Sequence, residues 1–563
     1  MTTVNEKKNW HKQYPDYIPK NIEEIKDDDS LLKYIQNAVK NHSNKTAFSF
    51  MGNDLSFKEV DDRSLQLAKF LQNTAGLKKG DTVAMQLPNL PQYPIALFAC
   101  FHAGLTLTNI NPLYTAREME HQLKSSDAKI IIIFSAFTYK LEQIIENTNL
   151  KNIIVTGPAD SFSFLKKQAI NFIFNKVKKL CPSYNITCTP VYSWQQSLNK
   201  NKNDSLNKAT ISSSDTAVLQ YTGGTTGVSK AAVLSHKNIL SNIRQIQTYV
   251  KNDISKNETV VTALPLYHIF AFTVNLLTFL EYGYQNVLIS DPRNTAAFIK
   301  TLKKYPWSIF TGVNTLFQSM LNHSDFNKLN FKQVKICIAG GAALQTNTAR
   351  QWKKTTGVNL VEGYGLTEAS PVLCCNLLSN PQEKSIGLPL PSTDIKFIDE
   401  AGNKVAQGEV GEIWAKGPQV MQCYLNNESE TNKVFHKEGS EIWLKTGDIA
   451  YQNEQGFVFI ADRKKDMILV SGFNVFPNEV ENILIEHKKI AEVAVVGVHS
   501  EKSGESVRAH IVKKDPSLTE AEVIKFAKEN LVNYKVPRII KFHTDLPKSN
   551  IGKILRRKLK DIN

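Results

Sequence analysis

The sequence predicts a layered α/β fold with a small β subdomain and a second, smaller α+β domain at the C-terminal end. Helix-like segments alternate with short apolar strands, as in residues 129–134 and 152–155. After one polar residue at the start, Lys129 or Asn152, each of these two ranges is wholly apolar. Such strands are typical of parallel sheets that helices cover on both faces. Between about residues 385 and 462, apolar and polar residues alternate instead, which predicts the β subdomain. A chain of 563 residues, 42% of them hydrophobic, can bury more than one core.

The expected domain order follows these changes of pattern. Residues 1–29 are polar and charged and are expected to form a loosely packed lead-in. Residues 30–462 form the large α/β domain, and residues 463–563 form the smaller, mobile one. The charged run at residues 462–465 separates two blocks of different composition, so we expect the domain boundary there.

Individual helices are predicted from their apolar residues and end signals. The two longest apolar runs, Pro94–Leu107 and Leu264–Leu280, are shorter than the roughly 20 residues that a membrane-spanning helix needs. We therefore expect both to be buried helices. In the C-terminal domain, Asn478 is the expected N-cap of one helix, and Thr519 with Glu522 forms the capping box of another.

The composition favours anionic partners. Lys and Arg total 68 against 53 Asp and Glu, a formal net charge of +15, and the basic residues are dispersed along the chain. This balance suits nucleotides, the phosphates of coenzyme A or anionic lipid. No zinc-finger spacing, RNA-binding aromatic signature or heptad array accompanies the charge, so nucleic acid is not an expected partner.

The expected location is the cytoplasm. The seven cysteines include no Cys-x-x-Cys pair and are expected to be reduced thiols. The first eight residues, Met-Thr-Thr-Val-Asn-Glu-Lys-Lys, are not followed by an apolar core, so no signal peptide is expected.

The strongest motif is Tyr221-Thr-Gly-Gly-Thr-Thr-Gly-Val-Ser-Lys230. Glycines allow a tight backbone whose N–H groups turn inward, while the threonines and the lysine add hydroxyl donors and a mobile cation. An ordinary hairpin turn needs neither three threonines nor a lysine, and a Walker loop is excluded because no Gly-Lys-Ser/Thr is present. The motif therefore predicts a polyphosphate-binding loop that comprises Tyr221, Thr222, Gly223, Gly224, Thr225, Thr226, Gly227 and Lys230.

Three further stretches complete a recognisable pattern. Val361–Ser370 carries a ring between glycines and then a hydroxyl and a carboxylate, Lys445–Asp448 carries a carboxylate on a turn, and Leu546–Arg557 carries a lysine on a glycine-bearing loop. In this order and spacing, the motifs resemble the adenylate-forming superfamily of acyl-CoA synthetases, peptide-synthetase adenylation domains and luciferases. The resemblance runs from about residue 30 to 557 and is closest to bacterial long-chain fatty-acid–CoA ligases.

The resemblance implies a ligase that uses ATP, a long-chain fatty acid and coenzyme A, with Mg²⁺ as cofactor. The carboxylate attacks the α-phosphate of ATP to form an acyl-adenylate and pyrophosphate, and coenzyme A then displaces AMP. The product would feed fatty-acid β-oxidation or lipid synthesis. Because carboxylate and triphosphate repel each other, the site must supply cations and donors where charge accumulates.

The same resemblance assigns the residues around the reacting phosphate. Lys230 and the glycine-rich loop hold the β- and γ-phosphates, Thr367 contacts the α-phosphate and Glu368 holds Mg²⁺. Lys553 bridges the attacking carboxylate and the α-phosphate. His268 is expected near the carboxylate end of the acyl channel, with a packed core histidine as the rival interpretation.

It also assigns the nucleoside site. Tyr364 is expected to stack on adenine, Asp448 to take the ribose hydroxyls, and Arg463 to reach the ribose and a nearby phosphate. The backbone of Gly340, Gly341 and Ala342 lines the adenine.

The resemblance also implies a movement of the C-terminal domain and a tunnel for the acyl chain. The C-terminal domain swings about a hinge at Lys465, first inserting Lys553 and then presenting Gly472 and Phe473 to form the pantetheine channel. Leu264–Phe272 and Thr311–Phe317 are expected to wall an apolar acyl tunnel.

Several alternatives stay open from the residues. A medium-chain or aryl acid–CoA ligase and a fatty-acyl-AMP ligase that loads a carrier protein share the motifs, whereas a non-catalytic fatty-acid-binding protein would not need them. Chain-length preference and oligomeric state, a homodimer among them, are not determined. The amphipathic segment Leu165–Leu180 is either a helix packed on its own domain or a peripheral contact with the cytoplasmic face of the membrane.

Overall fold

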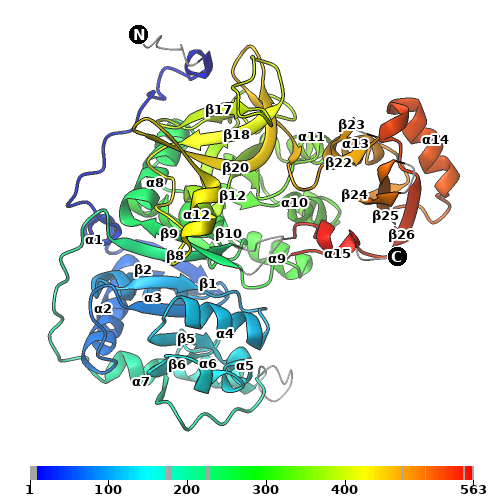
Figure 1. Cartoon of the computed structure of the whole chain (residues 1–563). Coiled ribbons are helices and arrows are strands. Elements are labelled where there is room, and N and C mark those ends of the chain that lie inside the picture. The colour runs from blue at the N-terminus through cyan, green and yellow to red at the C-terminus, as the bar shows by residue number, and fades with distance from the viewer. Residues whose placement is uncertain are drawn as a thin grey trace.

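A computed structural model describes residues 9–172, 174, 181–222, 229–471, 473–500, 503–549 and 552–560. Within them, three sheets make up the large N-terminal part, and a fourth lies in the C-terminal part, which stands at one side of the molecule (Figure 1). The layered α/β fold with a smaller α+β unit is therefore confirmed.

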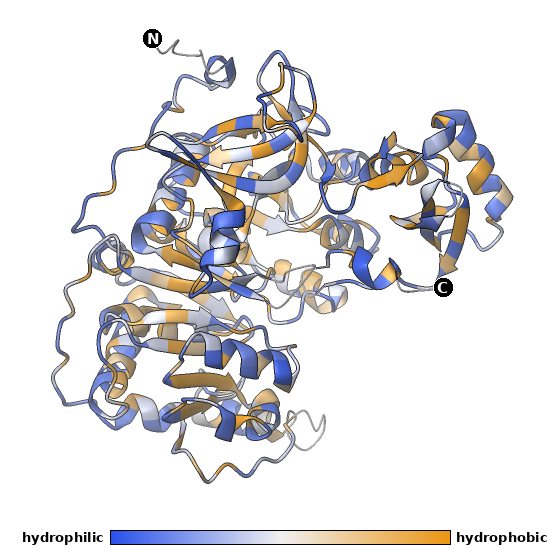
Figure 2. Ribbon diagram, viewed as in Figure 1, coloured by the Kyte–Doolittle hydropathy of each residue, from blue (hydrophilic) through white to orange (hydrophobic). Residues whose placement is uncertain are grey.

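The first sheet has the strand order β7-β6-β5-β3-β4-β8-β9 and is parallel except for its last pair. The apolar runs predicted as buried strands are β5 and β6. In Figure 2, hydrophobic residues concentrate on these strands, and polar ones lie on the helices outside. The seven strands are β3 Thr82–Gln86, β4 Thr106–Asn109, β5 Ile130–Phe134, β6 Asn152–Thr156, β7 Val191–Ser193, β8 Thr216–Thr222 and β9 Lys230–Ser235.

The polyphosphate motif runs from the end of β8 to the start of β9. These two strands pair antiparallel, with Thr222 opposite Lys230, so the motif is the connection of a β-hairpin. Residues 223–228 of this connection lie outside the described residues.

The second sheet has the order β16-β15-β14-β13-β12-β10-β11-β1-β2 and is parallel from β14 through β1. Parallel strands end at one edge, where open α/β sheets bind ligands. β13 ends at Gly340, which pairs with Gly363 on β14, and β14 runs two residues further, to Gly365. The nine strands are β1 Thr46–Phe50, β2 Asn53–Ser56, β10 Thr259–Thr262, β11 Gln285–Leu288, β12 Ile309–Gly312, β13 Ile336–Gly340, β14 Leu360–Gly365, β15 Val372–Cys375 and β16 Leu388–Pro389.

The third sheet is antiparallel and corresponds to the alternating stretch of the sequence. It pairs strands in the order β17-β18-β20-β19, with β21 on β20. The longest strand, β20, brings Asp448 opposite Arg463 on β21. The five strands are β17 Asp394–Ile398, β18 Gly411–Lys416, β19 Phe435–Glu438, β20 Glu441–Gln452 and β21 Val458–Arg463.

The fourth sheet and its helices form the C-terminal unit. Helices α13 and α14 pack on one face of the sheet, over a core that includes Val480, Leu484 and Val523. The five strands are β22 Ile468–Val470, β23 Phe473–Val475, β24 Ile490–Ser500, β25 Gly504–Lys513 and β26 Ile539–His543, of which only β26 pairs parallel with its neighbour.

Helices cover the sheets and join the strands. The α-helices are α1 Leu31–His42, α2 Phe57–Asn73, α3 Gln92–His102, α4 Ala116–Ser125, α5 Thr138–Glu142, α6 Phe164–Phe172, α7 Trp194–Asn199, α8 His236–Val250, α9 Thr295–Leu302, α10 Asn314–Leu321, α11 Thr346–Thr356, α12 Glu428–Val434, α13 Pro477–Leu484, α14 Glu520–Asn530 and α15 Arg556–Lys560. Shorter helical turns are η1 Asn9–Lys12, η2 Ser135–Phe137, η3 Ile145–Asn147, η6 Leu280–Tyr282, η7 Phe326–Lys328, η8 Thr367–Ala369 and η9 Asn533–Lys535, and η5 Ala271–Leu277 is a π-helix.

The helix-start predictions had different outcomes. The capping box of α14 is confirmed, because Thr519 and Glu522 exchange both expected hydrogen bonds. The N-cap prediction for Asn478 is wrong: α13 begins at Pro477, after Phe476. Proline is pre-organised for the first helical position, and the Asn478 N–H donates at 2.7 Å to the Asp462 carboxylate instead.

The two apolar runs are buried but are not single helices. Residues 94–102 of the first run lie in α3 and are buried, as expected, and a turn at Gly104 with φ of +71° and the start of β4 follow. Leu264–Leu280 begins as an irregular segment and becomes helical at residue 269, just before η5. Among the described residues, no helix has the length and apolar character needed to cross a membrane.

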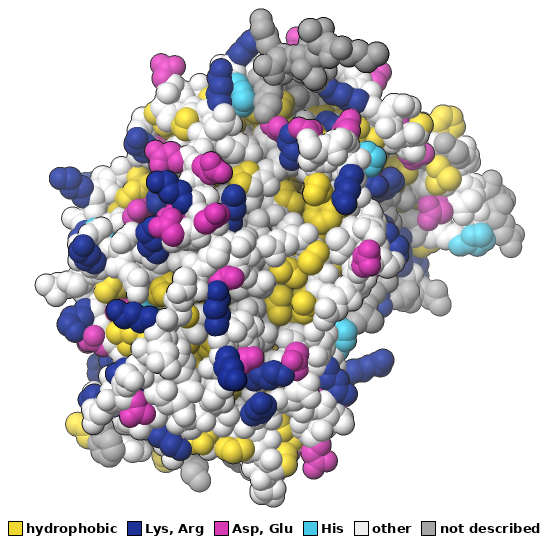
Figure 3. Space-filling model, turned by 60° about the vertical axis from the view of Figure 1, so that its left-hand side comes forward, with side chains coloured by type: hydrophobic (Ala, Val, Ile, Leu, Met, Phe, Trp, Pro, Cys, Tyr) yellow, Lys and Arg dark blue, Asp and Glu magenta, His cyan; other side chains and the backbone are white. Residues whose placement is uncertain are grey.

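The N-terminal lead-in is packed more closely than expected. Trp10, Tyr14 and Ile18 are at most 9% exposed and pack with Tyr249 and Leu390 in one hydrophobic cluster. These apolar residues are spaced four apart within a polar segment, and that spacing is the signal that its overall composition hides. On the face of the molecule in Figure 3, basic and acidic side chains are interspersed, as the dispersed charges of the sequence suggest.

Candidate active site

A cavity of about 1970 Å³ lies where the three N-terminal sheets meet the C-terminal unit. It brings together every described candidate residue except Phe473. From the sequence motifs, its lining includes Tyr221, Thr222, Lys230, His268, Gly340, Gly341, Ala342, Tyr364, Thr367, Glu368, Asp448, Arg463, Lys465 and Lys553. Gly223, Gly224, Thr225, Thr226, Gly227 and Gly472 lie outside the described residues.

One wall of the cavity is a chain of three polar side chains. The Tyr364 hydroxyl donates to Asp448 Oδ2 at 2.6 Å, and Arg463 Nε lies 3.0 Å from Asp448 Oδ1. Burial, together with the Asp448 carboxylate, raises the pKa of the Tyr364 phenol. Asp448 is 3% exposed, and its two carboxylate oxygens are bound by Tyr364 and Arg463, so the orientation of the carboxylate is well defined. This wall offers an aromatic ring beside a carboxylate and a guanidinium.

Glu362 is a further polar residue of the cavity that the motif analysis missed. It stands two positions before Tyr364 on β14, and both line the cavity. Burial raises the pKa of the Glu362 carboxyl to about 8. The only signal in the sequence is its place beside the Tyr364 motif.

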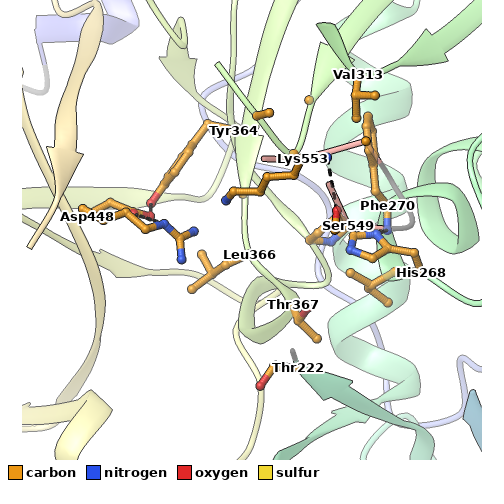
Figure 4. Close-up of a pocket in the computed structure, with 18 of the residues that line it drawn as sticks. Thr222, His268, Phe270, Val313, Tyr364, Leu366, Thr367, Asp448, Ser549 and Lys553 are labelled. Carbon is orange, nitrogen blue, oxygen red and sulfur yellow. Dashed lines mark hydrogen bonds and ion pairs between the residues drawn. The ribbon is translucent and has the colours of Figure 1, made fainter. Parts of the chain in front are cut away.

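Lys553 reaches the cavity from the C-terminal unit. In Figure 4 its side chain extends between Tyr364 on one side and His268 and Phe270 on the other. The loop that carries it is closed by bonds from Lys553 N to Ser549 Oγ (3.1 Å) and from Ser549 N to Lys553 O (2.6 Å). Desolvation, together with the Arg463 guanidinium, lowers the pKa of the Lys553 ammonium to about 8.

The Lys553 loop touches the large N-terminal part directly. Thr315, on α10, donates through Oγ1 to the Gly552 carbonyl at 3.3 Å. Gly552 has a φ of +81°, and a Cβ there would lie 2.5 Å from Thr315 Oγ1. A residue with a side chain would therefore both strain the loop and push it off α10.

Arg556 anchors this loop at its other end, and the sequence analysis gave it no role. Its guanidinium binds Glu481 at 2.7 Å and lies 3.2 Å from Asp462 Oδ1. The Asp462 side chain is fully buried, and its other oxygen accepts the Asn478 N–H. Asp462 precedes Lys465 whereas Arg556, Glu481 and Asn478 follow it, so this network joins the two sides of the predicted hinge.

His268 lies on the opposite wall from Asp448. Its Nδ1 accepts the Phe270 N–H at 3.3 Å, so a neutral ring carries its proton on Nε2. Burial, together with the nearby Lys553 ammonium, lowers the pKa of His268 to about 4, so the ring is neutral at pH 7. A neutral ring can donate one hydrogen bond into the cavity.

The predicted phosphate and metal ligands are held by a segment that no motif indicated. Tyr424 donates its hydroxyl to Glu368 Oε1 at 2.6 Å. Lys230 forms an ion pair with Glu430, and its Nζ lies 5.2 Å from the centre of the Tyr424 ring. Both Tyr424 and Glu430 line the cavity.

The cavity also has an apolar region. Tyr267–Phe270 and Val313–Thr315 contribute to the lining, as expected for the two predicted tunnel walls. Helix α8 and the segment around β15 and β16 contribute as well, which the sequence analysis did not predict. The apolar lining residues of these two segments are Ile246, Tyr249, Val250, Val372, Cys375, Ile386 and Leu390. Val274 and Ile338 also line the cavity.

Phe473 is not part of the cavity. It is 57% exposed and stacks on Tyr534 of the C-terminal unit, with ring centres 4.8 Å apart. Leu469, on the neighbouring strand, is 50% exposed. Both side chains are exposed in the present arrangement of the two units.

Known proteins share the sequence family and the fold of this chain. A family model described as AMP-binding enzyme matches residues 35–425, and a model of the AMP-binding enzyme C-terminal domain matches residues 479–553. Among solved structures, an anthranilate CoA ligase in complex with anthranoyl-AMP shares the fold with a TM-score of 0.83 at 24% identity, covering 95% of this chain and 97% of the other. ATP-bound MatB from Rhodopseudomonas palustris has a TM-score of 0.81 at 25% identity, with 94% and 98% covered. The fold and the cavity thus define an AMP-binding enzyme.

Curated relatives narrow the class further. A long-chain-fatty-acid–CoA ligase of Salmonella typhimurium is 46% identical over 99% of this chain and 98% of its own. The protein of the same name from Bacillus subtilis is 36% identical, again over 99% and 98%. The chain belongs to the AMP-binding enzyme family and, within it, to the long-chain-fatty-acid–CoA ligases.

Proposed function

We propose that the protein converts ATP, a long-chain fatty acid and coenzyme A into acyl-CoA, AMP and diphosphate through an acyl-adenylate, which supplies β-oxidation or lipid synthesis. One observation carries the proposal: Lys553, Asp448 and Glu368 come from distant parts of the chain and line one cavity. They supply a cation for two joining anions, a ligand for ribose hydroxyls and a carboxylate for a metal.

In the first half-reaction, the fatty carboxylate must approach a phosphate of the same charge. Lys553 offsets the charge of both, because one flexible ammonium can contact two oxyanions as they join. Arg463 lies near enough to lower the pKa of Lys553, so it adds positive potential at the same place. The Nε2–H of His268 offers a hydrogen bond that orients the carboxylate.

The nucleoside would occupy the wall around Asp448. With its orientation defined by Tyr364 and Arg463, the carboxylate can accept both ribose hydroxyls. The ring of Tyr364 provides a face for adenine, beside the backbone of Gly340–Ala342.

The chemistry of the donor set fits Mg²⁺ at Glu368. A single carboxylate is a suitable protein ligand, because Mg²⁺ in nucleotide sites takes most of its other ligands from phosphate oxygens and water. Glu368 Oε1 is held by Tyr424, which leaves Oε2 for the metal. When bound, Mg²⁺ would neutralise the charge of the departing pyrophosphate. Thr367, next in the chain, would contact the α-phosphate.

The second half-reaction requires Lys553 to leave. We propose that the large domain ends at residue 462 and that Lys465 is the hinge. A swing there would break the Arg556–Asp462 pair and the Gly552–Thr315 contact, and it would allow the exposed Phe473 to pack against the large N-terminal part. The bulk of a side chain at Gly472 would then impair thioester formation more than adenylate formation.

The apolar region of the cavity would take the acyl chain. Each CH₂ removed from water contributes about 0.8 kcal/mol, so a long chain can supply much of the binding free energy. We therefore expect kcat/KM to rise with chain length until the cavity is filled.

The test is acid-dependent AMP formation with coenzyme A, measured from octanoate to oleate and with benzoate. A maximum among the long chains supports the proposal, whereas a maximum at octanoate or benzoate would indicate a medium-chain or aryl acid ligase. Consumption of the adenylate by a carrier protein but not by free coenzyme A would indicate an acyl-AMP ligase. Failure to turn over ATP with oleate, Mg²⁺ and coenzyme A would refute the assignment.

We also propose that α6 makes a peripheral contact with an anionic membrane. Leu165 and Phe172 are 81% and 62% exposed, and Lys166 lies beside Leu165. Apolar side chains next to lysines suit the boundary of an anionic bilayer. The fraction of protein that sediments with vesicles of phosphatidylglycerol and phosphatidylcholine should be lower for the double variant Leu165→Ser/Phe172→Ser than for the wild type. Equal fractions for the variant and the wild type would refute the contact.

A further inference from the structure

Lys230 and Glu430 form a charged pair inside the predicted triphosphate site. Lys230 begins β9, and Glu430 lies in the first turn of α12, two hundred residues later. Lys433 bonds Glu430 Oε1 at 2.5 Å on the other side of the carboxylate. Hydrogen bonds from Lys230 and Lys433 hold the pKa of the Glu430 carboxyl at about 2, so it is fully charged at neutral pH.

The pair is not needed to attach its two segments to each other. Backbone hydrogen bonds already join the segment before α12 to β9: Val233 N donates to Cys423 O at 2.9 Å, and Leu425 N donates to Ala231 O at 2.9 Å. Tyr424 also forms a bridge with Ala232. A purely structural ion pair would add little to these contacts.

The Glu430 carboxylate instead places a negative charge in a site that is predicted to bind an anion. A site that receives a triphosphate should repel anions as little as possible, yet Glu430 lines the same cavity as Thr222, Lys230 and Glu368. The ammonium of Lys230 therefore has two competing partners, the Glu430 carboxylate and the phosphates. Lys433 can stay paired with Glu430 after Lys230 moves to the phosphates, so the Glu430 carboxylate keeps a cationic partner.

We propose that Glu430 is a resident counter-ion, from which Lys230 is released when the triphosphate binds and to which it returns when pyrophosphate departs. The inference rests on the proposed function of the cavity. Glu430 lowers the affinity for ATP and, by the same competition, favours the release of pyrophosphate. It acts through Lys230 and is a positioning residue.

The test is the substitution Glu430→Gln in the full chain, which removes the charge and keeps the shape of the side chain. Partly exposed ion pairs contribute little, so we expect the Kd for MgATP, measured by isothermal titration calorimetry, to fall about two- to five-fold. The inhibition constant of pyrophosphate should fall by a similar factor, and the KM for oleate should stay unchanged. Thermal melting checks that the variant is folded.

Two further variants separate competition from a general effect of charge. Glu428 is exposed and lies in the same first turn of α12, so Glu428→Gln makes the same change of charge beside the site and should leave the Kd unchanged. In a Lys230→Met background, Glu430→Gln should have no effect, because the competing cation is gone. A gain in affinity in either of these proteins would overturn the inference.

The remaining outcomes are equally distinct. Weaker ATP binding by Glu430→Gln would mean that Glu430 holds Lys230 in its binding position, which contradicts the proposal, and an unchanged Kd contradicts it as well. If the wild type binds MgATP but forms no AMP with oleate and coenzyme A, the proposed function fails, while the calorimetric comparison still decides the role of Glu430.

Discussion

Gly552→Ala should uncouple the two half-reactions. Gly552 precedes Lys553, and its added Cβ would lie 2.5 Å from Thr315 Oγ1 and 3.2 Å from Val313 Cγ2. Both neighbours belong to the large N-terminal part, so this crowding exists only while the Lys553 loop is inserted. The swing predicted for thioester formation would remove it.

The magnitude follows from two separate costs. The φ of +81° costs a residue with a Cβ about 1–2 kcal/mol, and this strain belongs to the loop wherever the C-terminal unit lies. Crowding against α10 adds about 1–3 kcal/mol, and only in the inserted arrangement. Because 1.4 kcal/mol is a factor of ten, the crowding should slow adenylation by about 5- to 150-fold relative to thioester formation.

The assay measures the half-reactions separately. Oleate-dependent ATP–pyrophosphate exchange reports adenylation, and acyl-CoA formation from supplied oleoyl-AMP reports the second step. The double variant Gly552→Ala/Thr315→Ala should recover part of the exchange rate, since it removes the closest clashing atom and leaves the strain. An equal loss in both half-reactions, or no recovery in the double variant, would refute this reasoning.

Four further predictions concern single residues. The pKa of Lys553, about 8, lies below the usual value, and the ammonium is the active form, so kcat/KM for adenylation should fall as pH rises above about 8. Lys553→Arg should remove this fall, because the guanidinium stays charged at these pH values. A flat wild-type profile up to pH 9.5 would contradict the role of Lys553. Lys553→Ala should abolish ATP–pyrophosphate exchange and spare acyl-CoA formation from oleoyl-AMP, and equal losses would contradict the swing. Tyr424→Phe removes the hydrogen bond to Glu368 and should raise the Mg²⁺ concentration for half-maximal exchange about 2- to 10-fold, whereas an unchanged Mg²⁺ titration would mean that Tyr424 does not position the carboxylate. Gly472→Trp should give the converse of Lys553→Ala, with adenylate formed and its conversion to acyl-CoA slowed, as single-turnover experiments would reveal.

Local signals in the sequence were enough for several elements. The apolar runs of β5 and β6 have no polar interruption, so their burial on both faces could be predicted without the fold. The capping box of α14 could be predicted because all its partners lie within four residues. The N-cap prediction for α13 was wrong, and the backbone N–H of Asn478 instead donates to Asp462, sixteen residues away.

The candidate site divides in the same way. Motif residues such as Lys553 and Asp448 could be predicted, since their neighbours in the chain carry the pattern. Tyr424, Glu430 and Arg556 could not, because their significance lies in partners 56, 200 and 94 residues away. Nothing next to them in the chain reveals such a partner.

The sequence by itself determined the fold class, the family and the residues of the motifs, since spacing and residue type are properties of the chain. Only the tertiary structure decided which of these residues meet, that Lys553 lies in the cavity while Phe473 lies outside it, and that the predicted phosphate-binding lysine already has a carboxylate partner. The physical reason is that hydrogen bonds and ion pairs depend on distances of a few ångströms in space, which folding sets between residues that are far apart in the chain.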